Sequence, residues 1–244
     1  MQIRVINPNT TESITRQIGV CAAAVAAVGT TVVAVNPDMG PASIESHYDE
    51  ALAVPGLLRE IERGERDGAD GFVIACFGDP GLDAARELAT GPVVGIAEAA
   101  MHAATFLGRS FAVVTTLART IGRAQDLAAH YGFSRHCVSF RACDVPVLEL
   151  EDPASDAYGQ ILRECLAAVD DDGADVIVLG CAGMADLCER LSREIGVPVV
   201  DGVAAATKQV EALVAMGLQT SRRGEFAPPP RKHYSGLLTE FAVV

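Results

Sequence analysis

The amino-acid sequence predicts an α/β protein built from two similar halves, each a parallel sheet of four strands flanked by helices. Short apolar, β-branched runs alternate with segments of helical period along the whole chain, a pattern typical of parallel sheets with helices on both faces. In addition, Gly68-Ala69-Asp70 and Gly173-Ala174-Asp175 are each followed by an apolar run and then by a cysteine, six residues after the aspartate. These two cysteines, Cys76 and Cys181, are 105 residues apart. Such a repeat indicates a duplicated unit.

The expected elements alternate in chain order. Strands are expected at residues 3–7, 31–35, 71–75, 93–96, 111–115, 137–142, 176–180 and 197–200. Helices are expected at residues 12–27, 48–66, 82–89, 120–131, 155–169, 184–195 and 203–216. Asp152-Pro153 is a start signal for the fifth of these helices, and Gly132 is a stop signal for the fourth.

The repeat also defines the expected domains. Pro92-Val93-Val94 follows the first cysteine as Pro198-Val199-Val200 follows the second. We therefore expect an N-terminal half at 1–98 and a C-terminal half at 99–205, with residues 206–244 crossing back onto the first half. The boundary should fall in a helix or loop near 97–109. The segment 219–235 contains three successive prolines and is expected to be an irregular extension on the N-terminal half or on a neighbouring subunit.

Composition excludes several classes of function. The net charge of −13 repels nucleic acid and anionic lipid, so neither is an expected partner. The longest uncharged stretch, 17–37, is interrupted by Gly19 and Gly29, and the N-terminus begins as a strand rather than a signal peptide. We therefore expect no membrane span and a cytoplasmic location. No two of the seven cysteines have the spacing of a zinc site, and no glycine-rich phosphate-binding loop occurs, so no metal and no cofactor are expected.

Cys76 and Cys181 are the candidate catalytic residues. Ligands of parallel sheets bind beyond the carboxyl ends of the strands, where both cysteines are expected, just before a helix whose N-terminus should lower the thiol pKa. If the halves face each other, two thiols meet a substrate from opposite sides. Inversion of a C–H centre needs this arrangement, because one thiolate removes a proton while the opposite thiol returns another. The structural alternative is two small buried residues; the match in both halves favours catalysis.

Five segments then carry a resemblance to a known family: residues 3–11, 42–46, 76–82, 113–116 and 179–184. Through them the chain resembles, over nearly its whole length, the hydantoin and allantoin racemase branch of the aspartate/glutamate racemase superfamily. The resemblance implies two four-stranded halves, an active site between them, Cys76 and Cys181 as acid and base without a cofactor, and a homo-oligomer. It also implies a substrate pocket formed by Asn9, Thr10, Ser43, Ile44, Gly78, Thr115, Thr116, Ala182 and Gly183.

The residues of these five segments also indicate whether the substrate is charged. Beyond Arg4 they contain no Lys, Arg or His, and a free amino-acid carboxylate would need such a partner. A small neutral cyclic ureide needs only amide and hydroxyl groups, which favours racemisation of 5-substituted hydantoins; allantoin, itself a substituted hydantoin, is equally compatible. Arg119 and Arg123 could still reach the cleft. His47, at a helix start, is expected to be solvated or to cap the helix.

Other functions stay open. Within the superfamily, a maleate isomerase uses a cysteine as nucleophile and an arylmalonate decarboxylase keeps only the second of the pair; the paired cysteines and weakly basic loops favour neither. From a different class, the chain could be a non-catalytic α/β protein whose halves close around a small ligand.

Overall fold

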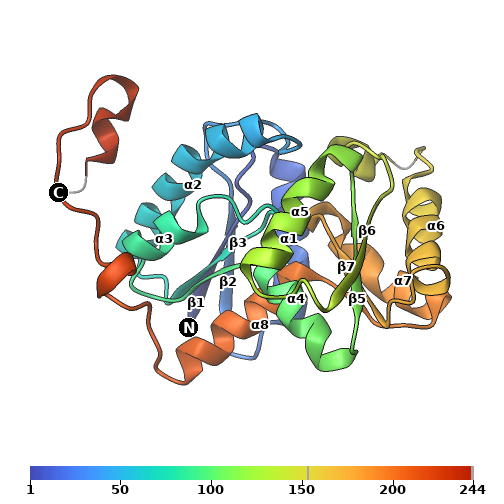
Figure 1. Cartoon of the computed structure of the whole chain (residues 1–244). Coiled ribbons are helices and arrows are strands. Elements are labelled where there is room, and N and C mark those ends of the chain that lie inside the picture. The colour runs from blue at the N-terminus through green and yellow to red at the C-terminus, as the bar shows by residue number, and fades with distance from the viewer. Residues whose placement is uncertain (153, 243–244) are drawn as a thin grey trace.

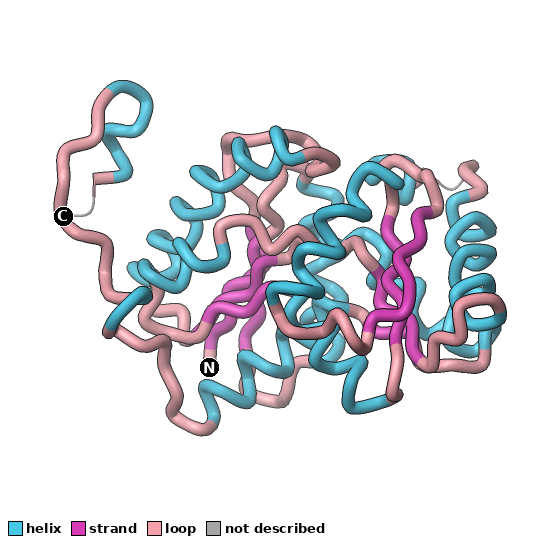
Figure 2. The backbone as a smooth tube through the Cα atoms, viewed as in Figure 1, coloured by secondary structure: helices cyan, strands magenta, loops and turns pink. Residues whose placement is uncertain are grey.

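The computed structural model describes residues 1–152 and 154–242, and its strands form two separate parallel sheets (Figures 1 and 2). The first sheet has the order β2-β1-β3-β4 and the second the order β6-β5-β7-β8, so the second repeats the first with every number raised by four. This confirms the expected fold class. The strands are β1 (Gln2–Ile6), β2 (Thr31–Val35), β3 (Gly71–Ile74), β4 (Val93–Gly95), β5 (Phe111–Thr115), β6 (Cys137–Ala142), β7 (Val176–Leu179) and β8 (Val199–Val200).

Helices connect the strands. They are α1 (Glu12–Val25), α2 (His47–Asp67), α3 (Leu82–Leu88), α4 (Ile96–Leu107), α5 (Ile121–His130), α6 (Ala157–Asp170), α7 (Cys188–Ile195) and α8 (Gly202–Ala215). Short 3-10 helices are η1 (Ala118–Thr120), η2 (Val147–Glu151), η3 (Ala182–Leu187), η4 (Gly224–Phe226) and η5 (Gly236–Phe241). Within the described residues, none of the helices combines the length and the apolar character that a membrane crossing requires.

Three helices differ from the expectation. α4 is not among the expected helices, because the sequence predicts only a helix or a loop near 97–109. The segment expected as one helix from 184 to 195 is divided into η3 and α7, because Met184 N donates to Cys181 O and begins a tighter turn. The helix expected at 155–169 begins at Ala157. Its expected start signal includes Pro153, which lies outside the described residues.

The repeated Gly-Ala-Asp segments have the same structural role in both halves. Asp70 Oδ2 accepts a hydrogen bond from Gln2 N at 2.7 Å, at the start of β1. Asp175 Oδ2 accepts bonds from Arg109 N and Ser110 N, both at 3.0 Å, just before β5. Because each aspartate precedes the third strand of its sheet, it ties that strand to the first and sets their relative position.

The core has three parts. A central cluster is shared by the two halves and joins Ile3 and Val5 to Phe111 and Val178, with α4 contributing Met101. Two outer clusters cover the opposite faces of the sheets, one in each half. The expected boundary between residues 98 and 99 falls inside α4, a helix that contacts β4 as well as β5 and β7.

The C-terminal segment returns to the N-terminal half. α8 packs against α1, β1, β3 and β4. The chain then runs along the outer side of this half (Figure 1), where Thr220 Oγ1 donates to Gly91 O at 2.7 Å. Further along, Arg222 Nη1 donates to Ala89 O at 3.0 Å, and Arg59 pairs with Glu240.

Candidate active site

A cavity of about 180 Å³ lies between the two halves. Its walls are the loops that follow β1, β3, β5 and β7, together with the starts of α2 and α5. Drug-sized ligands occupy pockets of roughly 300–1,000 Å³, so this cavity suits a smaller molecule. Cys76 and Cys181 both line it.

The two cysteines occupy equivalent positions. Each lies two residues beyond the end of its strand, Cys76 after β3 and Cys181 after β7, and each is partly exposed. A backbone turn follows both of them: Asp79 N donates to Cys76 O at 3.0 Å, and Met184 N donates to Cys181 O at 3.2 Å. The carboxyl ends of the two third strands therefore present one thiol each to a common cavity.

Both thiols are held in their protonated form at neutral pH. Burial raises the pKa of Cys76 to about 12 and that of Cys181 to about 11. The backbone N–H of Gly78 donates to Cys76 and that of Gly183 donates to Cys181, and each bond lowers the pKa of its thiol without offsetting the burial.

The direction of these shifts corrects the sequence expectation that a helix N-terminus lowers the thiol pKa. α3 begins only at Leu82, after the turn that contains Gly81, so Cys76 is not at the end of that helix. Cys181 does directly precede a helix, but η3 is a short 3-10 helix, whose dipole is small. Desolvation is therefore the largest influence at both sites.

Most of the expected pocket residues lie at the cavity. Cavity-lining positions are Asn9, Ile44, Gly78, Thr115, Thr116, Ala182 and Gly183. Thr10 and Ser43 lie outside the lining. Thr10 instead joins two loops, because its backbone N–H and its hydroxyl both donate to Pro41 O, at 2.9 and 3.3 Å.

A buried network holds Asn9 at the cavity. Asn7 Nδ2 donates to Asn9 Oδ1 at 2.8 Å and to Thr15 Oγ1 at 3.0 Å. Asn9 Oδ1 also accepts from Thr11 N at 2.9 Å, which forms an Asx turn before α1. Since the side-chain oxygen of Asn9 already accepts two bonds, its amide nitrogen is the group available to a ligand.

Four charged residues that the sequence analysis did not assign to the site also line the cavity. Glu45 and Glu50 come from the N-terminal half, and Arg119 and Arg123 from the C-terminal half. Arg123 Nε lies 3.4 Å from Glu50 Oε2. The lining thus contains two arginines and two glutamates, one of each in an ion pair between the halves.

The acidic residues are fixed by the start of α2. Ser46 caps the helix by accepting from Asp49 N at 3.2 Å, and Asp49 Oδ2 accepts from Glu45 N at 3.1 Å. Glu45 Oε1 in turn accepts from Val147 N of the C-terminal half at 2.9 Å. Burial raises the pKa of Glu50, and Arg123 and His47 partly offset this shift.

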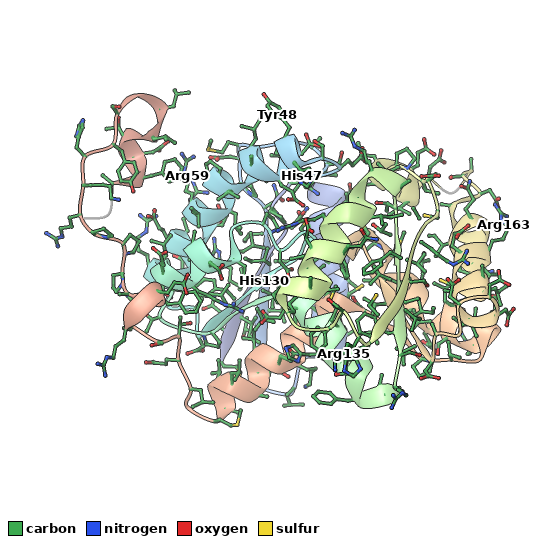
Figure 3. The ribbon with its side chains drawn as sticks, in the orientation of Figure 1. His47, Tyr48, Arg59, His130, Arg135 and Arg163 are labelled. Atoms are coloured by element: carbon green, nitrogen blue, oxygen red, sulfur yellow. The ribbon has the colours of Figure 1, made fainter. Side chains whose placement is uncertain are left out.

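His47 also lines the cavity, at the first position of α2 (Figure 3). Its side chain is 79% exposed, and Nδ1 lies 4.0 Å from Glu50 Oε2. This position agrees with a largely solvated side chain at the edge of the site. Across residues 1–152 and 154–242, His, Cys, Asp and Glu side chains form no group of three that could hold a metal ion.

Comparison with known proteins relates the whole chain to one family. The model of the family described as Asp/Glu/Hydantoin racemase matches residues 3–210. A hydantoin racemase from Rhizobium meliloti is 50% identical over 236 residues, which cover 97% of this chain and 98% of the relative. The solved structure of an allantoin racemase from Klebsiella pneumoniae is 52% identical, has a TM-score of 0.97 and covers 99% of both chains.

A second solved structure, allantoin racemase from Pseudomonas fluorescens, is 41% identical with a TM-score of 0.93, covering 97% of this chain and all of that one. The similarity thus extends over both halves and all the loops of the cavity. The chain belongs to the Asp/Glu/hydantoin racemase family.

Proposed function

We propose that this protein racemises a small cyclic ureide, a 5-substituted hydantoin or allantoin, with Cys76 and Cys181 as interchangeable acid and base and without a cofactor. The observation that carries the proposal is the placement of both thiols, from equivalent strand ends of two halves, around one small cavity. The high identity to proteins named hydantoin racemase and allantoin racemase supports the same reaction class.

The reaction balances without an external reagent. One cysteine, as thiolate, removes the proton from C5 of the ring, and the electron pair of the C–H bond moves into the adjacent carbonyl to give an enolate. The opposite cysteine, as thiol, then delivers its proton to the other face of C5 and becomes the thiolate. The product is the mirror image of the substrate at C5, and the two cysteines have exchanged roles.

The cavity offers neutral hydrogen-bond donors for the enolate oxygen. The amide nitrogen of Asn9 and the hydroxyl of Thr116 both belong to its walls. Donors fixed before the reaction stabilise a developing oxyanion without reorganising during it. The balanced charges of Glu45, Glu50, Arg119 and Arg123 agree with a neutral ureide rather than an amino acid with a free carboxylate.

Enantiopure hydantoins with 5-substituents of increasing size, together with enantiopure allantoin, provide the direct test. We expect optical rotation to decay to zero in the presence of protein, faster than the spontaneous rate without it. In deuterated water, one deuterium should enter C5 of the inverted product. The comparison of hydantoins with allantoin decides the preferred substrate. A protein that binds ureides but leaves rotation and C5 hydrogen unchanged would instead be the non-catalytic binding protein.

The raised thiol pKa values predict a distinctive pH dependence. The active form contains one thiolate and one thiol, and at pH 7 only a small fraction of either thiol is ionised because both pKa values lie above 10. We therefore expect kcat/KM to rise roughly tenfold per pH unit between pH 7 and 9, without the plateau near pH 8.5 expected for an ordinary cysteine. The assay should use an N3-methylated hydantoin as substrate, because its ring does not ionise between pH 7 and 9. A plateau below pH 8 would contradict the raised pKa values.

A further inference from the structure

The loops that carry the two cysteines are each held by a side chain from the opposite half. Arg123 of α5 donates to Gly78 O from Nε at 3.1 Å and from Nη2 at 2.6 Å. Gln17 of α1 donates from Nε2 to Gly183 O at 3.5 Å. Gly78 and Gly183 each lie two residues after a cysteine.

The two contacts are related by the internal repeat. Gly78 and Gly183 are 105 residues apart, like the cysteines, and Gln17 and Arg123 are 106 residues apart. α1 is the helix after the first strand of the N-terminal sheet, and α5 is the helix after the first strand of the C-terminal sheet. Equivalent helices therefore contact equivalent loops, each across the boundary between halves.

These loops matter for the chemistry because the same two glycines donate their N–H groups to the sulfurs. Gly78 N–H donates to Cys76, and Gly183 N–H donates to Cys181. A bond to the carbonyl of such a glycine limits the rotation of its backbone and keeps the N–H directed at the thiol. An added Cβ at Gly78 would meet the carboxylate of Glu50, so a side chain there would require that carboxylate to move.

We propose that Arg123 and Gln17 are reciprocal positioning residues: each half fixes the loop that carries the cysteine of the other half. This inference rests on the proposed racemase function. Since both bonds cross between the halves, each cysteine is fully positioned only when the halves are in contact around the cavity.

The hydrogen bonds that Arg123 and Gln17 make to the two loops differ in strength. Arg123 is charged, makes two bonds to the Gly78 carbonyl and also pairs with Glu50, whereas the bond from Gln17 to the Gly183 carbonyl is neutral and at the limit of hydrogen-bonding distance. We expect Arg123→Ala to slow catalysis by Cys76 by roughly 10- to 100-fold, the order of effect of a small displacement of a catalytic group. Gln17→Ala should slow catalysis by Cys181 by only about 2- to 5-fold, as expected for one weak bond.

Hydrogen exchange in variants that retain only one of the two cavity cysteines separates the two roles. Cys181→Ala leaves Cys76 alone, and this thiol should exchange the C5 proton of one hydantoin enantiomer with deuterated water; Cys76→Ala leaves Cys181 for the other enantiomer. Adding Arg123→Ala should slow exchange mainly in the protein that retains Cys76 and move its pH profile to higher pH. Adding Gln17→Ala should act mainly in the protein that retains Cys181. Arg123→Lys, which keeps the charge without the two-bond geometry, should give an intermediate rate.

Arg163→Ala is the matched control, because Arg163 lies on the outer side of the C-terminal half (Figure 3) and forms an exposed ion pair with Asp156. Circular dichroism checks the folding of each variant. Equal slowing in the Cys76→Ala and Cys181→Ala variants, or no slowing in either, would overturn the reciprocal assignment while leaving the racemase function intact. If the wild-type protein neither racemises nor exchanges the C5 proton of any hydantoin or allantoin, the proposed function fails and this inference fails with it.

Discussion

Replacing either cavity cysteine by alanine is expected to reduce racemisation by roughly 10³-fold or more, because a positioned acid or base contributes about 10²–10⁴-fold and inversion needs both. Neither loss should be compensated by the remaining thiol. Cys76 and Cys181 approach the cavity from different halves, so we expect each thiol to reach only one face of the ring. Polarimetry with an enantiopure hydantoin or allantoin measures the loss directly.

The two alanine variants should remain distinguishable by hydrogen exchange. Each keeps one base, and that base can still remove and return the C5 proton on its own side. Cys76→Ala and Cys181→Ala should therefore exchange deuterium into opposite enantiomers without inverting them, as detected by NMR. Cys137→Ala is the matched control, because Cys137 lies on β6 outside the cavity lining. Retained racemisation in either cavity variant would eliminate the two-base mechanism.

The repeat explains how much of this site the sequence could predict. Predicting the two matched cysteines at strand ends needs only the alternation of apolar runs and the 105-residue offset of the repeat. The structure places both cysteines at one cavity. Loops such as 9–10 and 115–116 directly follow strands, and the apolar pattern of a strand indicates where the strand ends and the loop begins. Thr10 differs because its polar groups are used to join loops, a role that no local pattern distinguishes from ligand contact.

For the charged residues of the cavity, the sequence indicated only that Arg119 and Arg123 could reach the cleft, and it did not single out Glu45 or Glu50. Glu50, Arg119 and Arg123 lie on or next to helices, and the side of a helix that faces the cavity depends on how the two halves pack together. Arg119 lies in η1 and Arg123 in α5, so their spacing of four residues spans two helices and was only a weak signal that both face the same side. The direction of the thiol pKa shifts likewise depends on burial, which a sequence does not quantify.

α4 shows a similar limit. It is apolar and rich in alanine, with Glu98, His102 and Thr105 as its few polar residues, so the sequence predicts only a helix or a loop at the boundary near 97–109. The structure uses it as a helix in the shared core. Its N-terminus is capped from a distant part of the chain, by the carboxylate of Asp79 in the turn after Cys76.

Asp79→Ala is accordingly expected to lower the free energy of unfolding by roughly 2–4 kcal/mol, because it removes a helix cap and leaves buried donors without partners. Asp79 Oδ1 accepts from Ala97 N at 3.1 Å, and Oδ2 accepts from Glu98 N at 3.0 Å and from the Tyr131 hydroxyl at 2.7 Å. The carboxylate is buried, and Gly95 leaves the space that it needs. Urea unfolding at pH 7 measures the change. Tyr131→Phe, which removes one of the three donors, should cost only about 1 kcal/mol.

The same carboxyl group predicts a dependence of stability on pH. Burial raises the pKa of Asp79 to about 6, from an ordinary value of 3.8, so between these values the folded protein binds more protons than the unfolded chain. The contribution of Asp79 to stability is thus fully present below about pH 4 and decreases as the pH rises towards 6. Asp79→Asn does not titrate, and the difference in unfolding free energy between wild type and this variant should shrink over that window and stay constant above pH 7. A difference that grows with pH would show that the folded protein instead favours the ionised form, as in an ordinary exposed helix cap. Since Asp79 follows Cys76 by three residues, the same variant should also reduce racemisation, which would tie the stability of the helix cap to the position of the thiol.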